Sequence, residues 1–303
     1  MTDMLPTIVL LMVPATLPSR AQARTDGLRY HEQYSGLGRM TGDELLAEIP
    51  ELGDVARIEV DPGNEHAVAT PADLVAFSRH VQSASDKPVV ITGAQRPFSA
   101  LGTDGPANLY NAFRVAASTQ ARGKGVLVTV NDEIHTARDV TKTSTYRTHT
   151  FKSREFGPLG VADGDGVRFY RLPLRRHTTA SEFRLTADTV LPRIDVIYGY
   201  AGANGDLAEA AVGLGAKGLV IAGVGAGSLG DMRETVARLC AAGTAVVRSA
   251  RVGEGRVVRQ DNWQEPGMVA ADNLNPQKSA LLLALALTVT DNPERIQSIF
   301  DSY

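Results

Sequence analysis

A lysine among hydroxyl side chains follows an apolar run near the middle of the chain. The apolar run covers residues 125–130, and Lys142 lies in the stretch 138–145, which reads Arg-Asp-Val-Thr-Lys-Thr-Ser-Thr. A lysine whose charge is disfavoured by burial or by its neighbours can take a proton from a hydroxyl nucleophile. The pattern therefore favours a proton-relay role for Lys142 over a solvated lysine on a turn.

Two further turns also follow apolar runs. One reads Gly-Ala-Gln-Arg at 93–96, and the other reads Gly-Val-Gly-Ala-Gly-Ser at 223–228. In open α/β sheets, sites form outside the carboxyl ends of the strands, so we expect both turns and the lysine segment to face one crevice. The second turn lacks the full spacing of a dinucleotide-binding loop, and we do not predict nucleotide binding there.

No set of residues in the sequence has the spacing of a metal site. His135 follows Asn-Asp-Glu at 131–133, but neither a second histidine four residues away nor a cysteine cluster accompanies it. A hydrogen-bonded histidine is the simpler interpretation, because metal sites need several ligands at suitable spacing. Glu65 and His66 could form an acid–base pair, but adjacent side chains on an extended chain point to opposite faces.

Short β-rich runs alternate with helical patterns, which predicts an α/β fold with helices on both faces. The expected strands are 7–11, 88–92, 126–130, 195–198, 218–222 and 245–248. The expected helices are 43–49, 71–82, one that opens with Asp104 as its N-cap, 207–214, 232–242, 276–287 and 293–300. We expect a larger N-terminal mixed-sheet domain at 1–170, a linker at 171–192 and a smaller C-terminal parallel-sheet domain at 193–303.

The composition argues against two classes of partner. The chain has 303 residues, of which 43% are hydrophobic and 21% charged, and its formal net charge is −3. These values fit a soluble globular protein. No basic stripe indicates nucleic acid, no basic amphipathic face indicates a membrane surface, and the apolar run 281–287 is too short to span a bilayer.

The N-terminus has two interpretations. Residues 5–14 are apolar, and Ala-Gln-Ala at 21–23 has the form of a signal-peptide cleavage site. However, Asp3 precedes the apolar run and no Lys or Arg does, so we favour a first buried strand. This interpretation favours a cytoplasmic location for the protein, with a periplasmic location as the alternative.

Several segments resemble bacterial L-asparaginases of the asparaginase/glutaminase family, with a type II-like pattern. The segments 89–97, 104–110, 125–145, 157–160, 221–227, 247–249 and 274–277 follow the order of the family. Residues 170–181 are similar to its linker. The resemblance covers most of residues 86–303 and is patchier within 1–85.

The resemblance implies hydrolysis of L-asparagine, and often of L-glutamine more slowly, to the acid and ammonia without a metal or cofactor. A threonine of the first loop attacks the side-chain amide, a lysine-containing relay moves the proton, and water hydrolyses the acyl-enzyme. The resemblance also implies a homotetramer, built as a dimer of dimers with sites at the dimer contact.

By resemblance, Thr16 falls on the nucleophile and Lys142 on the relay lysine. Ala94 falls on the position whose backbone carbonyl meets the substrate amide, and Gln95 follows it in the same turn. Ser228 falls on a substrate-side polar position of the C-terminal domain.

Two assignments stay open. A tyrosine of the first loop assists the nucleophile in the family, and Tyr34 is our candidate, although Tyr30 also qualifies by position. The family also uses an acidic residue from the neighbouring subunit, and Gln264 and Glu265 lie in the corresponding region without a firm match.

The chain departs from the family pattern at three places. The first loop reads Val-Pro-Ala-Thr-Leu-Pro at 13–18, where the family has a glycine-rich turn whose amides approach an oxyanion. Two prolines remove two amide donors from that loop. The substrate-binding serine that the family has before the 71–82 helix is replaced by residues around 65–67.

The third departure is the largest. The family inserts a strand, a loop with a second threonine and an aspartate, and a helix between the positions of Val81 and Asp86. Here only 82–85 joins those positions, so Lys142 loses its usual hydroxyl partner and the sheet loses an internal strand. We therefore expect weak or absent activity. A catalytically dead homologue that binds a small amino acid is one alternative, and a damaged gene copy that does not fold stably is another.

Overall fold

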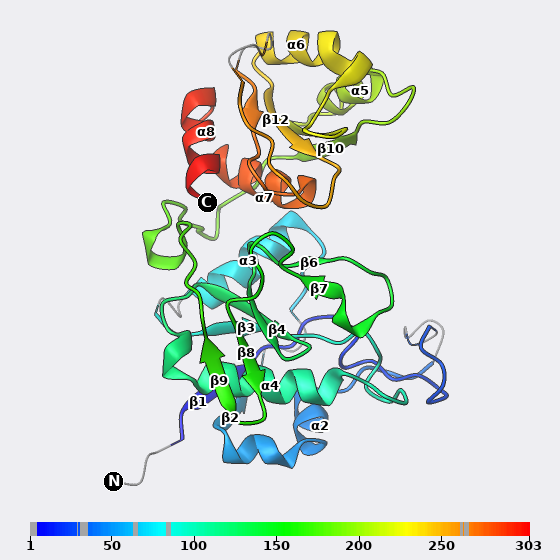
Figure 1. The fold of residues 1–303 in the computed structure, drawn as a ribbon, viewed down its shortest axis with the longest axis vertical. Helices are drawn as coiled ribbons and strands as arrows, with labels where there is room; N and C mark the ends of the chain where they lie inside the picture. The colour runs from blue at the N-terminus through cyan, green and yellow to red at the C-terminus, as the bar shows by residue number, and fades with distance from the viewer. Residues whose placement is uncertain are drawn as a thin grey trace. The chain divides into compact units, whose positions relative to one another are not determined.

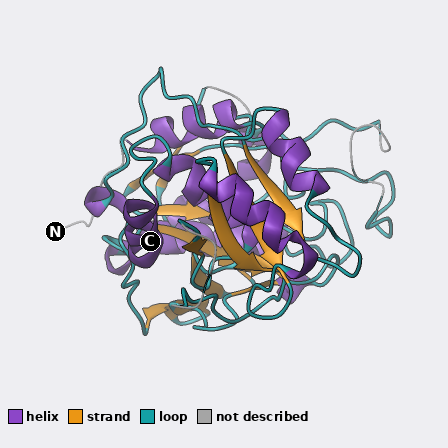
Figure 2. Cartoon of the chain, turned by 90° about the horizontal axis from the view of Figure 1, so that it is seen from above, coloured by secondary structure: helices purple, strands orange, loops and turns teal. Residues whose placement is uncertain are grey.

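The computed structural model describes residues 5–28, 30, 36–62, 66–82, 86–260, 263 and 267–303. The chain divides into two compact units, Met1–Ala180 and Ser181–Tyr303, which are described separately below. Extended loops join many of the helices and strands (Figure 2). Thr16, Ala94 and Gln95 lie outside the helices and strands.

The first unit contains a mixed five-stranded sheet in the order β3-β4-β5-β8-β9. Its strands β3 and β4 are parallel, and the remaining neighbours are antiparallel. The bounds of its strands are β3 Val89–Ile91, β4 Val126–Val130, β5 Glu133–Thr136, β8 Gly160–Asp163 and β9 Gly166–Phe169. A separate antiparallel hairpin pairs β6 (Thr141–Lys142) with β7 (Phe151–Lys152).

A second, two-stranded parallel sheet in the same unit pairs β1 (Thr7–Leu10) with β2 (Arg57–Val60). Among the described residues, no strand pairing joins β1 to β3. Val9 of β1 is 51% exposed and Ile91 of β3 is 45% exposed. The parallel strands of this unit are therefore split between two sheets, as we expect if one internal strand is missing.

Helix α4 (Gly105–Ala117) connects the two sheets through its apolar side chains. Leu109 and Phe113 of α4 belong to one buried cluster, and the partly buried Ile8 and Leu10 of β1 pack against it. Ala94, just after β3, belongs to the same cluster. Burial of a large apolar side chain contributes about 1.5–3 kcal/mol. Packing on α4 therefore stabilises the association of the two sheets, which no described strand pairing joins.

The other helices of this unit begin where local signals place them. Thr41 and Glu44 form a capping box at the start of α2 (Gly42–Ala47), which satisfies two backbone groups reciprocally. Helix α3 spans Pro71–Gln82, as its apolar periodicity predicts. The 3-10 turns are η1 (Pro50–Asp54), η2 (Thr119–Ala121), η3 (Thr148–Thr150) and η4 (Thr178–Ala180).

The second unit is built on a four-stranded parallel sheet in the order β10-β11-β12-β13. Its central strand β11 (Gly218–Gly223) is buried along its whole length, as is usual for a parallel strand covered on both faces. The other strands are β10 (Ile194–Tyr198), β12 (Ala245–Ala250) and β13 (Val269–Ala270).

Helices cover both faces of this parallel sheet. Helices α5 (Asp206–Gly213) and α6 (Arg233–Ala241) share a buried cluster with Leu219 and Ile221. Helices α7 (Pro276–Ala286) and α8 (Pro293–Ser302) share the opposite cluster with Val220. Figure 1 shows α7 and α6 on opposite sides of β10 and β12. The predicted fold class, a mixed sheet followed by a parallel sheet with helices, is confirmed.

Candidate active site

The loop after β1 carries Thr16, and its hydroxyl lies next to a tyrosine. Thr16 Oγ1 donates a hydrogen bond to the hydroxyl oxygen of Tyr30 over 3.4 Å, and both residues are half-buried. A threonine that donates to a base is oriented to lose its proton as it attacks, and such bonds are often long before substrate binds. Tyr34, our sequence candidate for this role, lies outside the described residues.

Backbone contacts hold the Thr16 loop in a folded-back shape. The Ser19 amide donates to the Thr16 carbonyl over 3.0 Å, and the Met40 amide donates to the Pro18 carbonyl over 2.8 Å. Leu17 is 5% exposed and anchors the loop in the core beneath it. The threonine therefore sits on a fixed turn between two prolines, which restrict φ at their own positions.

The same loop is joined to the segment that follows β3. The Phe98 amide donates to the Ser19 carbonyl over 2.9 Å, and the Ala21 amide donates to the Ser99 hydroxyl over 2.8 Å. Ala94 packs in the cluster that also contains Leu17. The Thr16 loop is therefore in contact with the segment that contains the 93–96 turn.

Asp104 organises the turn that contains Ala94 and Gln95. Its carboxylate accepts the backbone amide of Gln95 over 3.0 Å and that of Arg96 over 3.0 Å. It also accepts the side-chain amide of Asn108 over 3.1 Å. Asp104 occupies the N-cap position of α4 but makes no side-chain cap bond. The predicted N-cap position is confirmed, but the side chain caps no helix amide, because its carboxylate binds the 93–96 turn instead.

Asn108 extends this network to the end of β4. Its side-chain nitrogen donates to the Gly93 carbonyl over 2.9 Å, and its side-chain oxygen accepts the Asn131 amide over 2.8 Å. Asn108 is 3% exposed, and a buried amide with its groups paired fixes its neighbours tightly. Asp104 and Asn108 were not predicted as anchors of this turn, although an aspartate and an asparagine four residues apart on one helix face were a visible signal.

Lys142 ends strand β6, and its side chain is exposed. Among the described residues, its ammonium group makes no hydrogen bond or ion pair. The segment after it is fixed by Thr150, whose carbonyl accepts the Thr143 amide over 2.8 Å and whose hydroxyl accepts the Ser144 amide over 2.6 Å. The Lys142 backbone is therefore held firmly while its charged end stays accessible.

Gln95 links the turn to this lysine segment. Its side-chain amide donates to the Arg147 carbonyl over 3.2 Å. Arg147 lies in the connection between β6 and β7. The Thr16 loop, the 93–96 turn and the Lys142 hairpin are thus connected in series by hydrogen bonds within the first unit.

Ser228 belongs to the second unit, where it closes the loop after β11. Its amide donates to the Val224 carbonyl over 2.7 Å, and its own carbonyl accepts the Val224 amide over 3.1 Å. The carbonyl of Gly227, before it, accepts Arg248 Nε over 2.5 Å. The Arg248 guanidinium also lies 4.4 Å from the centre of the Trp263 ring. The Ser228 side chain is exposed at the end of this anchored loop.

Two protein-family models match this chain, one in each half. The model "Asparaginase, N-terminal" matches residues 74–175, and "Glutaminase/Asparaginase C-terminal domain" matches residues 193–300. L-asparaginase 2 of Escherichia coli (strain K12) is 44% identical over 332 residues, covering 99% of this chain and 94% of that protein. This chain belongs to the asparaginase family.

Other family members agree with this assignment. L-asparaginase 2 of Bacillus subtilis (strain 168) is 37% identical, covering 99% of this chain and 87% of that protein. The crystal structure of a probable cytoplasmic L-asparaginase from Campylobacter jejuni matches with a TM-score of 0.91 and 30% identity, covering 99% of this chain and 100% of that one. The resemblance inferred from the segments between 89 and 277 is confirmed.

The asparaginase relatives are longer than this chain in the matched region. The two L-asparaginase 2 alignments run over 332 residues, whereas this chain has 303, so at least 29 aligned positions have no counterpart here. That shortfall is large enough for a strand, a loop and a helix. It agrees with the split between β1 and β3.

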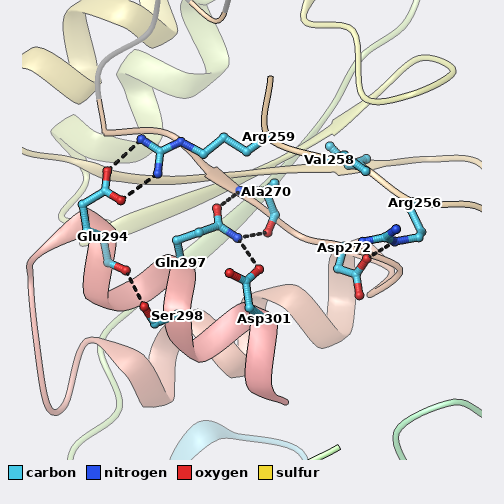
Figure 3. A pocket seen from close by; sticks show the side chains of 10 residues that line it. Arg256, Val258, Arg259, Ala270, Asp272, Glu294, Gln297, Ser298 and Asp301 are labelled. Carbon is cyan, nitrogen blue, oxygen red and sulfur yellow. Dashed lines mark hydrogen bonds and ion pairs between the residues drawn. The ribbon is translucent and has the colours of Figure 1, made fainter. Parts of the chain in front are cut away.

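A groove in the second unit of this asparaginase-family chain does not coincide with the predicted site (Figure 3). Its volume is about 350 Å³, and none of the six predicted site residues lines it. Its polar side chains bind one another: Arg259 forms two hydrogen bonds with Glu294, of 2.8 and 2.7 Å. Gln297 accepts the Ala270 amide over 2.8 Å. These polar side chains of the groove thus have partners within the second unit.

One group of side chains near the Thr16 loop could hold a metal ion. Asp61, His66 and His80 bring a carboxylate and two imidazoles together. These three residues were not predicted as ligands, because they lie on different elements at irregular spacing.

Proposed function

We propose that this chain is an L-asparagine amidohydrolase that forms L-aspartate and ammonia, with L-glutamine as a further candidate substrate. Family membership supports the reaction class, and relatives named glutaminase-asparaginase support the second substrate. The observation that carries the proposal is the hydrogen bond from Thr16 to Tyr30, on a loop joined to the 93–96 turn.

The proposed mechanism begins at the Thr16 hydroxyl. Its oxygen attacks the side-chain amide carbon of the substrate while its proton passes to the Tyr30 oxygen, which gives its own hydroxyl proton to the relay. Lys142 completes the relay and delivers a proton to the amide nitrogen, which leaves as ammonia. Water then hydrolyses the ester on Thr16, releasing aspartate and restoring the hydroxyl. Tyr30 takes the role first given to Tyr34, because its oxygen lies within reach of Thr16.

Three residues are proposed to bind the substrate. The backbone carbonyl of Ala94 accepts the substrate amide, and Gln95 keeps that carbonyl in place through its hydrogen bond to Arg147. Ser228 offers an exposed hydroxyl from the second unit. This chemistry uses no metal or cofactor.

We propose a dimer of dimers as the assembly, as the family resemblance implies. No helix among the described residues has both the length and the apolar character needed to cross a bilayer. Among relatives, the Campylobacter jejuni protein is named cytoplasmic and the Haemophilus influenzae protein periplasmic. We propose the cytoplasm for this chain, with the periplasm as the alternative.

A second candidate function is binding of a small amino acid without turnover. Two observations favour it: no hydroxyl bonds to Lys142 among the described residues, and the sheet is split between β1 and β3. Two prolines also flank Thr16, where an oxyanion site would need amide donors.

The deciding experiment measures ammonia release from L-asparagine by the purified chain and by Lys142→Met. Release that disappears in Lys142→Met supports the amidohydrolase. If neither protein releases ammonia while calorimetry detects aspartate binding, the binding function replaces it. If neither activity nor binding is found, a thermal melt follows: a cooperative transition rules out a damaged, unfolded product, and its absence supports one.

A further inference from the structure

Three side chains from three parts of the first unit meet at the carboxyl end of β2. Asp61 directly follows that strand, His66 lies in the next loop, and His80 is in the last turn of α3. Asp61 Oδ2 lies 2.9 Å from His66 Nε2, and Asp61 Oδ1 lies 3.4 Å from His80 Nε2. One donor atom from each of the three residues lies within 4.8 Å of the others. The two imidazole rings therefore converge on one carboxylate.

The cluster is sheltered on one side and open on the other. The side chains of Asp61 and His66 are 13% and 18% exposed, whereas that of His80 is 45% exposed. The ring of His66 also packs against Phe77, with centroids 5.4 Å apart. Two donors are thus held in place and the third faces solvent, which leaves a path for an ion to enter.

The donor set fits a borderline divalent cation. Zinc binds imidazole nitrogen and carboxylate oxygen at about 2.0–2.2 Å, and three protein ligands with one open position form a common arrangement. Two nitrogens in a set of three suit zinc better than magnesium or calcium, which prefer oxygen ligands. Binding requires the side chains to rotate until all three donors, which lie within 4.8 Å of one another, face one ion.

We propose that Asp61, His66 and His80 form a Zn²⁺ site that ties α3 to the carboxyl end of β2. The Asp61 amide donates to the Leu10 carbonyl over 3.0 Å, and the His66 amide donates to the Met12 carbonyl over 2.8 Å. A bound ion would therefore also stiffen the start of the Thr16 loop. The site is structural and takes no part in the proposed amide hydrolysis.

The test uses the full chain without a histidine tag, treated with chelator and then dialysed against Zn²⁺. Elemental analysis should find one Zn²⁺ per chain, and Zn²⁺ should raise the Tm, because a ligand that binds only the folded state stabilises it. His80→Gln should weaken binding by more than the roughly 10–100-fold that loss of an outer-shell partner causes. His80 is at the exposed end of α3, so this variant should fold.

His149→Gln is the matched control, because His149 is exposed and belongs to another segment. It should keep the wild-type stoichiometry and Tm increase. Absence of zinc from the wild-type chain, or equal loss in both variants, would overturn the proposal and leave an ordinary hydrogen-bonded cluster. Co²⁺ provides a second readout: visible absorption of a low-coordinate site should appear in the wild type and in His149→Gln, but not in His80→Gln. None of these readouts depends on ammonia release, so they stand apart from the proposed enzymatic function.

Discussion

The hydroxyl of Thr16 donates to the hydroxyl oxygen of Tyr30 over 3.4 Å, although 14 positions of chain separate them. Two hydroxyl groups in this relation can pass a proton from nucleophile to base. The contact is a physical reason to propose that Tyr30 assists Thr16, which sequence position alone did not provide.

If Tyr30 assists Thr16, Tyr30→Phe should lower kcat for L-asparagine by about 10²–10⁴-fold, which is the usual range for loss of a general base. Thr16→Val should abolish ester formation altogether. Steady-state ammonia release with matched melting curves would measure both effects. Tyr34→Phe is the paired control, and a larger loss in Tyr34→Phe than in Tyr30→Phe would assign the role to Tyr34.

Asp104→Asn should loosen the 93–96 turn. The carboxylate accepts both the Gln95 and Arg96 amides, and a hydrogen bond to a charged group contributes about 1.5–3 kcal/mol. We expect the free energy of unfolding in urea to fall by about that amount, and KM to rise more than kcat falls. Asp188→Asn, at an exposed position, should change neither quantity. Equal stability of the two variants would contradict the anchoring role.

His135 should make the protein less stable in mild acid. Burial lowers the pKa of His135 from 6.5, and the nearby Glu133 carboxylate only partly opposes that shift. Below about pH 6.5, the unfolded chain therefore binds a proton at this residue that the folded chain does not bind. The free energy of unfolding falls as the pH drops below that value towards the lower pKa of the folded state. The slope from this residue is at most about 1.4 kcal/mol per pH unit.

Urea unfolding between pH 7 and pH 5 would measure this effect in the wild type and in His135→Leu. The variant removes the titrating group, although it leaves the Ser153 hydroxyl without its 2.9 Å contact to His135 Nδ1. It should be less stable at pH 7 but lose less stability on acidification. An unchanged slope would show that other groups control the acid response.

Much of the fold was predictable because strong local signals define its elements. The bounds of α3 and β4 agree with the predicted 71–82 and 126–130, since one has clear helical periodicity and the other is a continuous apolar run. The two-residue strands β6 and β7 were not predicted. Their pairing of Lys142 with Phe151 depends on tertiary contact and leaves no periodic pattern.

The site was predictable as a set of segments but not as a geometry. Sequence position could not show that Asp104 turns away from its own helix to bind the Gln95 amide. Sequence position also could not show that His80 lies beside Asp61, since these residues lie on different elements. The predicted roles of Thr16 and Lys142 remain predictions until the variants are measured.

The division between β1 and β3 has a consequence for how the molecule opens. Strand β1 pairs only with β2 among the described residues, and apolar packing on α4 joins this pair to the rest of its unit. Segments held by few backbone pairs open at lower free energy than central strands. Amide hydrogens of β1 and β2 should therefore exchange with deuterium faster than those of β4 and β5. The Thr16 loop would then belong to a separate cooperative unit, able to unfold and refold while the five-stranded sheet stays intact.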